Sequence, residues 1–205
     1  MWYSFKYFRK WIFCKIPYNN QIINVLLTNH HVINENLLLI GKKIRTYYKG
    51  EYKEIQITKN RLIFTDSRDY KKGLDYTGIY IFKEDGFNIN NFFETDNYNI
   101  SNYNRIKICI LQYPKGNELE IKTGYIEDLN KYEIFHSADT EHGSSGSPII
   151  CINKNYNVIW IHRRYHKIKK LNHGSYIKYY RIYAKYGKKW YLRLWKIWKK
   201  IFLFR

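Results

Sequence analysis

The chain has 205 residues, a length that suits one domain or one domain with a short appendage. Apolar residues make up 45% and aromatic residues 19%, which excludes a disordered polymer and allows a sizeable core. The net charge is +19, but 15 of the 36 basic residues and none of the 17 acidic residues lie in the last 45 positions. The basic charge therefore belongs to the C-terminal segment rather than to the rest of the chain.

The cysteines and the N-terminal sequence indicate the cellular compartment in which the protein is expected. Cys14, Cys109 and Cys151 are too few and too scattered for a disulfide scaffold, and their odd number favours a reducing compartment. No apolar run approaches the roughly 18 residues that a membrane-spanning helix needs. The N-terminus interrupts its apolar stretches with charges and lacks the pattern of a signal peptide. We therefore expect a cytoplasmic protein, with a peripheral membrane location as the alternative.

Most of the chain reads as short β-strands separated by turns. Apolar, β-branched and aromatic runs recur, and turn-forming pairs such as Lys49-Gly50 and Asp85-Gly86 lie between them. Many short strands at this spacing predict an all-β sandwich or barrel. A short helical or irregular turn is expected over 88–93. In chain order, the expected strands cover 10–16, 21–27, 37–40, 43–48, 54–57, 79–82, 105–111, 118–125, 133–135, 148–152, 157–161 and 175–182.

The last 20 residues follow a different pattern. Large apolar residues recur every three or four positions from Trp190 to Phe202, with Arg193, Lys196 and Lys199 between them. This spacing predicts a basic amphipathic helix over 186–205. Three roles stay open for this helix: packing on the preceding domain, binding an anionic membrane surface, or binding nucleic acid through basic and aromatic side chains.

Three short stretches carry residues suited to catalysis. An apolar run leads into His30 and His31, Asp75 heads an alternating apolar strand, and Ser145 lies between two glycines. A serine hydroxyl is a poor nucleophile unless a base lies within hydrogen-bond reach, and the base needs a carboxylate to orient it. The glycines permit a tight turn whose backbone N–H groups face a developing oxyanion.

In this order, the three stretches resemble the trypsin-like serine peptidases, which have the chymotrypsin fold. Thr28-Asn29-His30-His31-Val32 is similar to the T-N-x-H-V motif of the disulfide-free branch, which includes glutamyl endopeptidases. Gly143-Ser144-Ser145-Gly146-Ser147-Pro148 is similar to the G-x-S-G-S-P motif of the same branch. The Gly143 to Pro148 motif is the more specific of the two.

The resemblance assigns roles to individual residues. It implies that His31 is the general base, that Asp75 orients it, and that Ser145 is the nucleophile. It also implies that the N–H groups of Gly143 and Ser145 form the oxyanion hole. His30 is then the spectator of the histidine pair.

The resemblance also points to Asp139, Thr140 and His162 as substrate-binding residues. Asp139 stands where trypsin carries the aspartate that pairs with Lys or Arg at the P1 position of the substrate. Thr140 and His162 match residues that hold an acidic P1 side chain in glutamyl endopeptidases. Arg163 and Arg164 favour an acidic substrate electrostatically, but they are bulky where the family has small residues. We expect an acidic P1 residue, with a basic one as the alternative.

Together these features predict an all-β, chymotrypsin-like double β-barrel over 1–185, with a boundary between barrels near 100–105, followed by the helix over 186–205. The implied function is a serine endopeptidase that acts on a polypeptide without a cofactor or metal, since the histidines lack metal-ligand spacing with the cysteines. The alternative is a catalytically silent peptidase-fold protein. In that case the cationic C-terminal segment binds an anionic membrane surface or nucleic acid.

Overall fold

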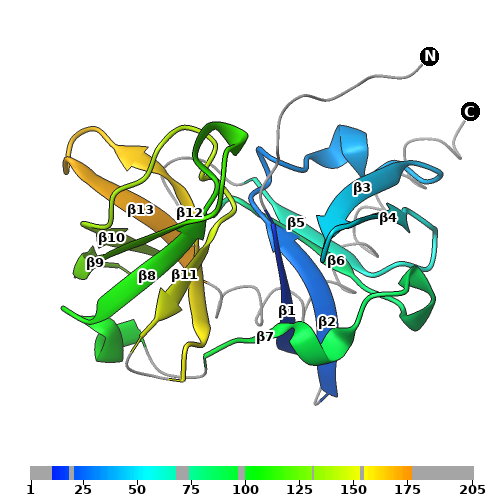
Figure 1. The fold of residues 1–205 in the computed structure, drawn as a ribbon, viewed down its shortest axis with the longest axis horizontal. Helices are drawn as coiled ribbons and strands as arrows, with labels where there is room; N and C mark the ends of the chain where they lie inside the picture. Colours follow the sequence, from blue (N-terminus) through cyan, green and yellow to red (C-terminus); the bar gives the residue numbers. More distant parts are fainter. Residues whose placement is uncertain are drawn as a thin grey trace, which may run out of the picture.

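The computed structural model describes residues 11–18, 21–67, 74–96, 100–130, 132–152 and 155–176. The expected helix over 186–205 lies outside the described residues, as does the end of the expected strand over 175–182. Within the described ranges the chain forms thirteen strands and five short 3-10 helices. They build two halves that lie side by side (Figure 1).

The first half contains β1 to β7. Five strands form one sheet in the order β5-β6-β2-β1-β7, and β3 and β4 form a separate antiparallel hairpin. The hairpin packs on the sheet because Ile44 and Ile55 share an apolar cluster with Leu26 and Ile79. This half is therefore a sheet completed by a packed hairpin. The strands are β1 Ile12–Tyr18, β2 Gln21–Thr28, β3 Lys43–Tyr48, β4 Glu51–Gln56, β5 Ile63–Asp66, β6 Tyr76–Tyr80 and β7 Phe93–Glu94.

The second half is a closed barrel of six strands in the order β10-β13-β12-β11-β8-β9. Buried side chains such as Ile108, Ile126, Ile149 and Trp160 fill its interior. Its strands are β8 Lys107–Gln112, β9 Glu120–Leu129, β10 Glu133–His136, β11 Pro148–Cys151, β12 Val158–His166 and β13 Leu171–Tyr176. The 3-10 helices of the two halves are η1 Glu35–Leu37, η2 Lys83–Asp85, η3 Ile89–Asn91, η4 Ile100–Tyr103 and η5 Pro114–Gly116.

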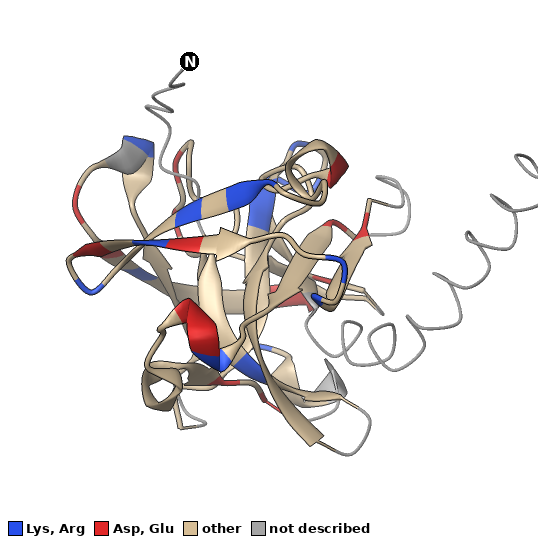
Figure 2. Ribbon diagram, turned by 90° about the vertical axis from the view of Figure 1, so that its right-hand side faces the viewer, with Lys and Arg blue, Asp and Glu red and all other residues tan. Residues whose placement is uncertain are grey.

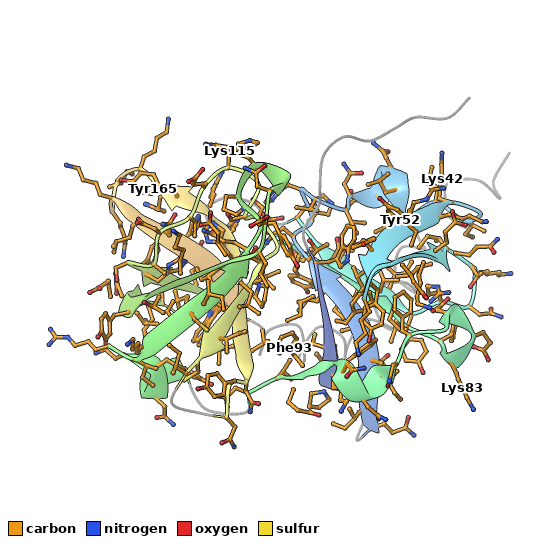
Figure 3. All side chains as sticks on the ribbon, in the orientation of Figure 1. Lys42, Tyr52, Lys83, Phe93, Lys115 and Tyr165 are labelled. Carbon is orange, nitrogen blue, oxygen red and sulfur yellow. The ribbon has the colours of Figure 1, made fainter. Side chains whose placement is uncertain are left out.

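A shared core joins the two halves. Val25 of the first half packs in one apolar cluster with Ile150 and Val158 of the second. β7 pairs in parallel with β1, and Thr95, directly after β7, forms a bridge to Val158. Phe93, at the start of β7, lies between the two halves in Figure 3. A side chain from one half can therefore be held in a defined position against the other.

The first half departs from the expected strands at three places, one of which is the short unexpected strand β7. The strand expected over 37–40 is wrong: the chain there forms η1 and a turn, and Leu39 and Ile40 are 56% and 68% exposed. A short apolar run without alternation does not specify a strand. β5 was not expected, and it places the Phe64 ring where a Cβ on Gly78 would come within 2.1 Å. The helical turn expected over 88–93 is confirmed by η3, Ile89–Asn91.

All three cysteines are buried, and none of them forms a disulfide. Cys14 lies in β1 with no exposed area, and burial raises the pKa of its thiol. Cys109 and Cys151 lie on the neighbouring strands β8 and β11, and burial also raises the pKa of Cys109. The three residues therefore pack as small apolar side chains, and no disulfide holds the halves together.

Charges of both signs are mixed on the β3–β4 hairpin, on the face of the first half that Figure 2 shows. Lys43 and Arg45 both reach Glu54, at 2.8 and 3.4 Å. Lys53 lies 3.6 Å from Glu51. Exposed pairs of this kind stabilise a fold only slightly, but they agree with the nearly balanced charge of the sequence before residue 161.

Candidate active site

His31 and Asp75 meet because β2 and β6 are neighbours in the sheet. Thr28, the last residue of β2, is in register with Thr77 near the start of β6. His31 follows β2 closely, and Asp75 directly precedes β6. The Nδ1 atom of His31 lies 2.6 Å from Oδ2 of Asp75, and the His31 backbone N–H donates to Oδ1 at 3.1 Å. The carboxylate is thus fixed on both the ring and the backbone of His31.

Asn29 holds the turn that presents His31. Its side-chain amide donates to the carbonyl oxygen of Asp75 at 3.0 Å, and its own carbonyl oxygen accepts from the N–H groups of Val32 and Ile33. The neighbouring His30 side chain points to Glu35 instead of Asp75, with its Nε2 atom 2.6 Å from Oε2 of Glu35. His31, the residue before Val32, is therefore the histidine that contacts the Asp75 carboxylate.

Electrostatics keep the Asp75 carboxyl ionised. Burial raises its pKa, but the hydrogen bond and charge of His31 and the charge of Arg163 outweigh burial, so the pKa lies below its usual value. The Asp75 side chain is 10% exposed, whereas that of His31 is 48% exposed. An ionised carboxylate in this position stabilises a positive charge on the imidazole. The ring itself remains accessible to a substrate.

Ser145 lies in a tight turn just before β11. Gly143 and Gly146 have φ angles of +94° and +86°, the left-handed region that glycine adopts without strain. The Gly146 N–H donates to the carbonyl oxygen of His162 at 2.9 Å. Within the described residues, the N–H groups of Gly143 and Ser145 have no hydrogen-bond acceptor. Two unpaired donors on one turn are suited to binding an oxyanion.

Gln112, at the end of β8, is fully buried and supports this turn. Its Oε1 atom accepts from the Ser144 hydroxyl at 2.7 Å, and its Nε2 atom lies 3.4 Å from the carbonyl oxygen of Asp139. The Lys115 N–H donates to the carbonyl oxygen of His142 at 3.0 Å, and Figure 3 places Lys115 near this end of β8. The turn before β11 is therefore tied to the barrel. No local sequence signal identified Gln112 as a support.

The turns that carry the three expected catalytic residues surround one pocket of about 380 Å³. His31, Asp75 and Ser145 all line it. The Ser145 hydroxyl donates to the carbonyl oxygen of Arg163 at 2.9 Å, and not to His31 within the described part of the chain. A hydrogen bond from this hydroxyl to the imidazole would have to replace the bond to Arg163. The full lining is His30, His31, Ser67, Leu74, Asp75, Ser145, Arg163 and Arg164.

The residues expected to bind the P1 side chain lie outside the lining of this pocket. Asp139 is exposed, and the Thr140 hydroxyl donates to Oδ1 of Asn172 at 2.7 Å. His162 is 2% exposed, with its Nδ1 atom 3.4 Å from Nε2 of His136. Burial lowers the pKa of His162, and the charge of His136 lowers it further, so the ring is neutral at pH 7. Asn172 was not anticipated from the sequence.

Arg163 lies inside the protein rather than in the path of a substrate. The register of β12 against β13 shifts between His162 and Arg164, which leaves Arg163 in a bulge. Its side chain is 5% exposed, with Nε 3.2 Å from Oδ2 of Asp75 and Nη1 3.1 Å from Oε1 of Glu133. The guanidinium is therefore buried between two carboxylates that come from different halves.

Metal and membrane features can be stated for the described ranges only. No group of three or more His, Cys, Asp and Glu side chains there is arranged to hold a metal ion. None of the helices in those ranges is both long and apolar enough to cross a membrane.

Solved structures share this arrangement of strands. A Glu endopeptidase matches with a TM-score of 0.57 and 16% identity, over 84% of this chain and 89% of that chain. The serine protease domain of the Sesbania mosaic virus polyprotein matches with a TM-score of 0.53 and 18% identity, over 85% and 83%. This chain has the chymotrypsin-like fold of trypsin-like serine peptidases. A serine endoprotease from Yersinia pestis matches with a TM-score of 0.51 and 13% identity, over 81% and 57%.

The expected all-β, chymotrypsin-like fold is confirmed, with a closed barrel in the second half and a sheet with a packed hairpin in the first. No family model matches the sequence, and no curated protein matches it by sequence. The likeness therefore lies in the path of the backbone.

Proposed function

We propose that the protein is a serine endopeptidase, a hydrolase that cleaves peptide bonds through an acyl-enzyme. One observation carries the proposal: the His31–Asp75 pair, joined at 2.6 Å, and the Ser145 turn line the same pocket. The two come from different halves of the molecule and from distant parts of the sequence. The chymotrypsin-like fold supports the proposal, since solved proteins with this fold include serine proteases.

The proposed reaction begins when Oγ of Ser145 attacks the carbonyl carbon of the scissile bond. The hydroxyl proton passes to Nε2 of His31, and the Asp75 carboxylate stabilises the resulting imidazolium. The N–H groups of Gly143 and Ser145 bind the oxyanion of the tetrahedral intermediate. His31 then gives the proton to the leaving amine. Water hydrolyses the acyl-enzyme by the same steps and restores the free serine.

For the substrate, we propose an acidic residue at P1, held by Thr140 and His162, rather than a basic residue held by Asp139. Arg164 lines the pocket, and its positive charge favours an acidic substrate. Peptides that differ only in Glu, Asp or Lys at P1 distinguish the two cases. Faster cleavage after Lys, abolished by Asp139→Asn, would contradict the acidic preference.

Labelling with a fluorophosphonate probe tests the endopeptidase proposal before any substrate is known. The folded protein is expected to react at Ser145, and Ser145→Ala and His31→Ala should lower the labelling rate by at least about 10⁴-fold. Ser137→Ala is the matched control, because the Ser137 hydroxyl is exposed and bonds to the backbone of Tyr125. This control variant should be labelled at the original rate.

A folded protein that is not labelled would contradict the endopeptidase proposal. Far-UV circular dichroism of the same sample establishes that the β structure is present. The result would favour the catalytically silent alternative, in which the segment over 186–205 binds a membrane or nucleic acid. That segment lies outside the described residues, so cosedimentation of the full chain with anionic vesicles or RNA would then be the next measurement.

A further inference from the structure

A buried chain of charged groups crosses from one half to the other behind the pocket. Oδ2 of Asp75, from the first half, lies 3.2 Å from Nε of Arg163 in the second half. Nη1 of Arg163 lies 3.1 Å from Oε1 of Glu133, which in turn lies 3.1 Å from Nδ1 of His173. The four side chains are between 2% and 13% exposed. The chain begins at the carboxylate that contacts His31 and ends inside the second barrel.

The guanidinium group suits this place because its donors form a rigid fork. One nitrogen of Arg163 reaches Asp75 while another reaches Glu133, which a single ammonium group does less well. A buried charged group is tolerated only when it has a partner of opposite charge, because burial removes its hydration. The bulge in β12 turns the Arg163 side chain inward and leaves its carbonyl oxygen as the acceptor for the Ser145 hydroxyl.

Charge balance explains why two carboxylates flank one arginine. An arginine beside Asp75 alone would neutralise that carboxylate and weaken its support for a positive imidazole on His31. Glu133 restores one net negative charge to the group formed by Asp75, Arg163 and Glu133. When His31 takes a proton from the nucleophile, this group and the His31 imidazolium together carry no net charge. His173 adds a further contact that orients Glu133.

We propose that Arg163 is a positioning residue that fixes Asp75 from the opposite half, and that Glu133 is the counter-charge that keeps Arg163 from neutralising Asp75. This inference rests on the proposed endopeptidase function. Arg163 acts through Asp75 and His31 rather than on the substrate.

The inactivation kinetics of a fluorophosphonate probe test the role of Arg163. Arg163→Met is expected to lower the maximal rate of inactivation by about 10- to 100-fold, because Asp75 loses its fixed position. The concentration of probe at half-saturation should stay within about twofold, since the pocket for the probe is kept. Arg163→Lys should recover part of the rate, because it keeps the charge without the fork. An unchanged rate in folded Arg163→Met protein would overturn the proposal.

Arg61 provides a matched control in the first half. Its guanidinium is also buried, with 3% of the side chain exposed, and it forms two bonds to the Asp85 carboxylate at 2.7 and 2.8 Å. Arg61 does not line the pocket. Arg61→Met should therefore lower the stability of the protein and leave the maximal inactivation rate of the folded fraction unchanged. An equal loss of rate in this variant would show that Arg163 acts only through general stability.

Glu133 gives a second and independent test. Glu133→Gln leaves Arg163 facing Asp75 without its counter-charge, so its inactivation rate should fall by about tenfold or more. In the Arg163→Met background no arginine remains for Glu133 to balance, so adding Glu133→Gln should lower the rate by less than about twofold further. A further loss as large as that of Glu133→Gln alone would overturn the counter-charge role of Glu133.

Failure of the endopeptidase proposal can be told apart from failure of this inference. If the unmodified protein does not react with the probe, the endopeptidase function fails. The linkage between the halves is then still measured by a double-mutant cycle of Asp75→Asn and Arg163→Met in urea unfolding. Additive losses of stability in that cycle would show that the two side chains are not coupled, and would overturn the inference by itself.

Discussion

The two halves of the molecule arrange their parts of the proposed active site to different extents. In the first half, His31 and Asp75 are already joined by a ring hydrogen bond and a backbone hydrogen bond. In the second half, the backbone turn at Ser145 is in place, but the hydroxyl is bonded to the carbonyl oxygen of Arg163. The proposed base and its carboxylate are thus already joined, whereas the hydroxyl of the proposed nucleophile is bonded to the backbone.

The halves also differ in how they carry histidine. His136, His162 and His173 of the second half are all buried, and burial lowers the pKa of each, that of His136 to about 3. In the described part of the first half, His30 is half-buried and His31 is exposed. The second half therefore contains buried neutral imidazoles, so protonation at acid pH destabilises its fold. The histidines of the first half are at least partly exposed to solvent.

The largest expected effect comes from breaking the prepared pair in the first half. Asp75→Asn replaces an acceptor-only carboxylate with an amide, which no longer holds the His31 ring in the required tautomer. We expect the fluorophosphonate labelling rate at neutral pH to fall by about 10⁴-fold. Circular dichroism checks that the variant is folded. A loss below about tenfold would mean that the pair does not activate the serine.

A smaller effect is expected from the turn in the second half. Gly143→Ala places a side chain at a φ of +94° and strains the turn that presents the two unpaired N–H groups. Loss of one oxyanion donor costs about 10²- to 10³-fold in rate, and we expect a fall in labelling rate of that size. The control is Gly50→Ala, at a φ of +86° in the β3–β4 turn. That variant should lose stability but not rate, and an equal loss of rate would contradict the assignment of the oxyanion hole.

The smallest expected effect is on the pH dependence of the free energy of unfolding, which comes from the buried histidines of the second half. Because the folded-state pKa values of His136, His162 and His173 are lowered, their contribution to stability is present above the unfolded pKa of about 6.5 and is lost as the pH falls below it. Each ring that stays neutral in the folded protein costs about 1.4 kcal/mol per pH unit in this range. Urea unfolding between pH 8 and pH 5 measures the slope. His136→Gln should give a shallower slope, and an equally steep one would show that His136 does not contribute.

The residues proposed for catalysis could be singled out from the sequence because each belongs to a local pattern at the end of a strand. His31 and Ser145 lie in short motifs, and Asp75 heads an apolar strand that the sequence marks. The supports could not be predicted in this way. Arg163 and Asp75 are 88 positions apart, and their contact depends on a bulge in β12 and on how the two halves pack. From the sequence, Arg163 was interpreted as a bulky residue at the end of a strand and as a charge that favours an acidic substrate, not as a partner of Asp75.

The fold shows the same division between local and long-range information. Strands with clear alternation, such as β1, were expected near their observed bounds, Ile12–Tyr18. The run over 37–40 has no alternation, and it becomes η1 and a turn because no strand pairs with it in the described structure. The binding of a P1 side chain by Asp139, Thr140 and His162 stays a prediction. It depends on side chains that a bound peptide would arrange.

The reactivity of the buried cysteines can report how often the strands around them separate. Cys14 belongs to the first half, while Cys109 and Cys151 belong to the second, and their thiols are shielded from solvent. A thiol reagent can modify them only when the surrounding strands separate, so the rate of modification measures how often each half opens. Peptide mapping of the modified protein would show which half opens first, without any engineered label.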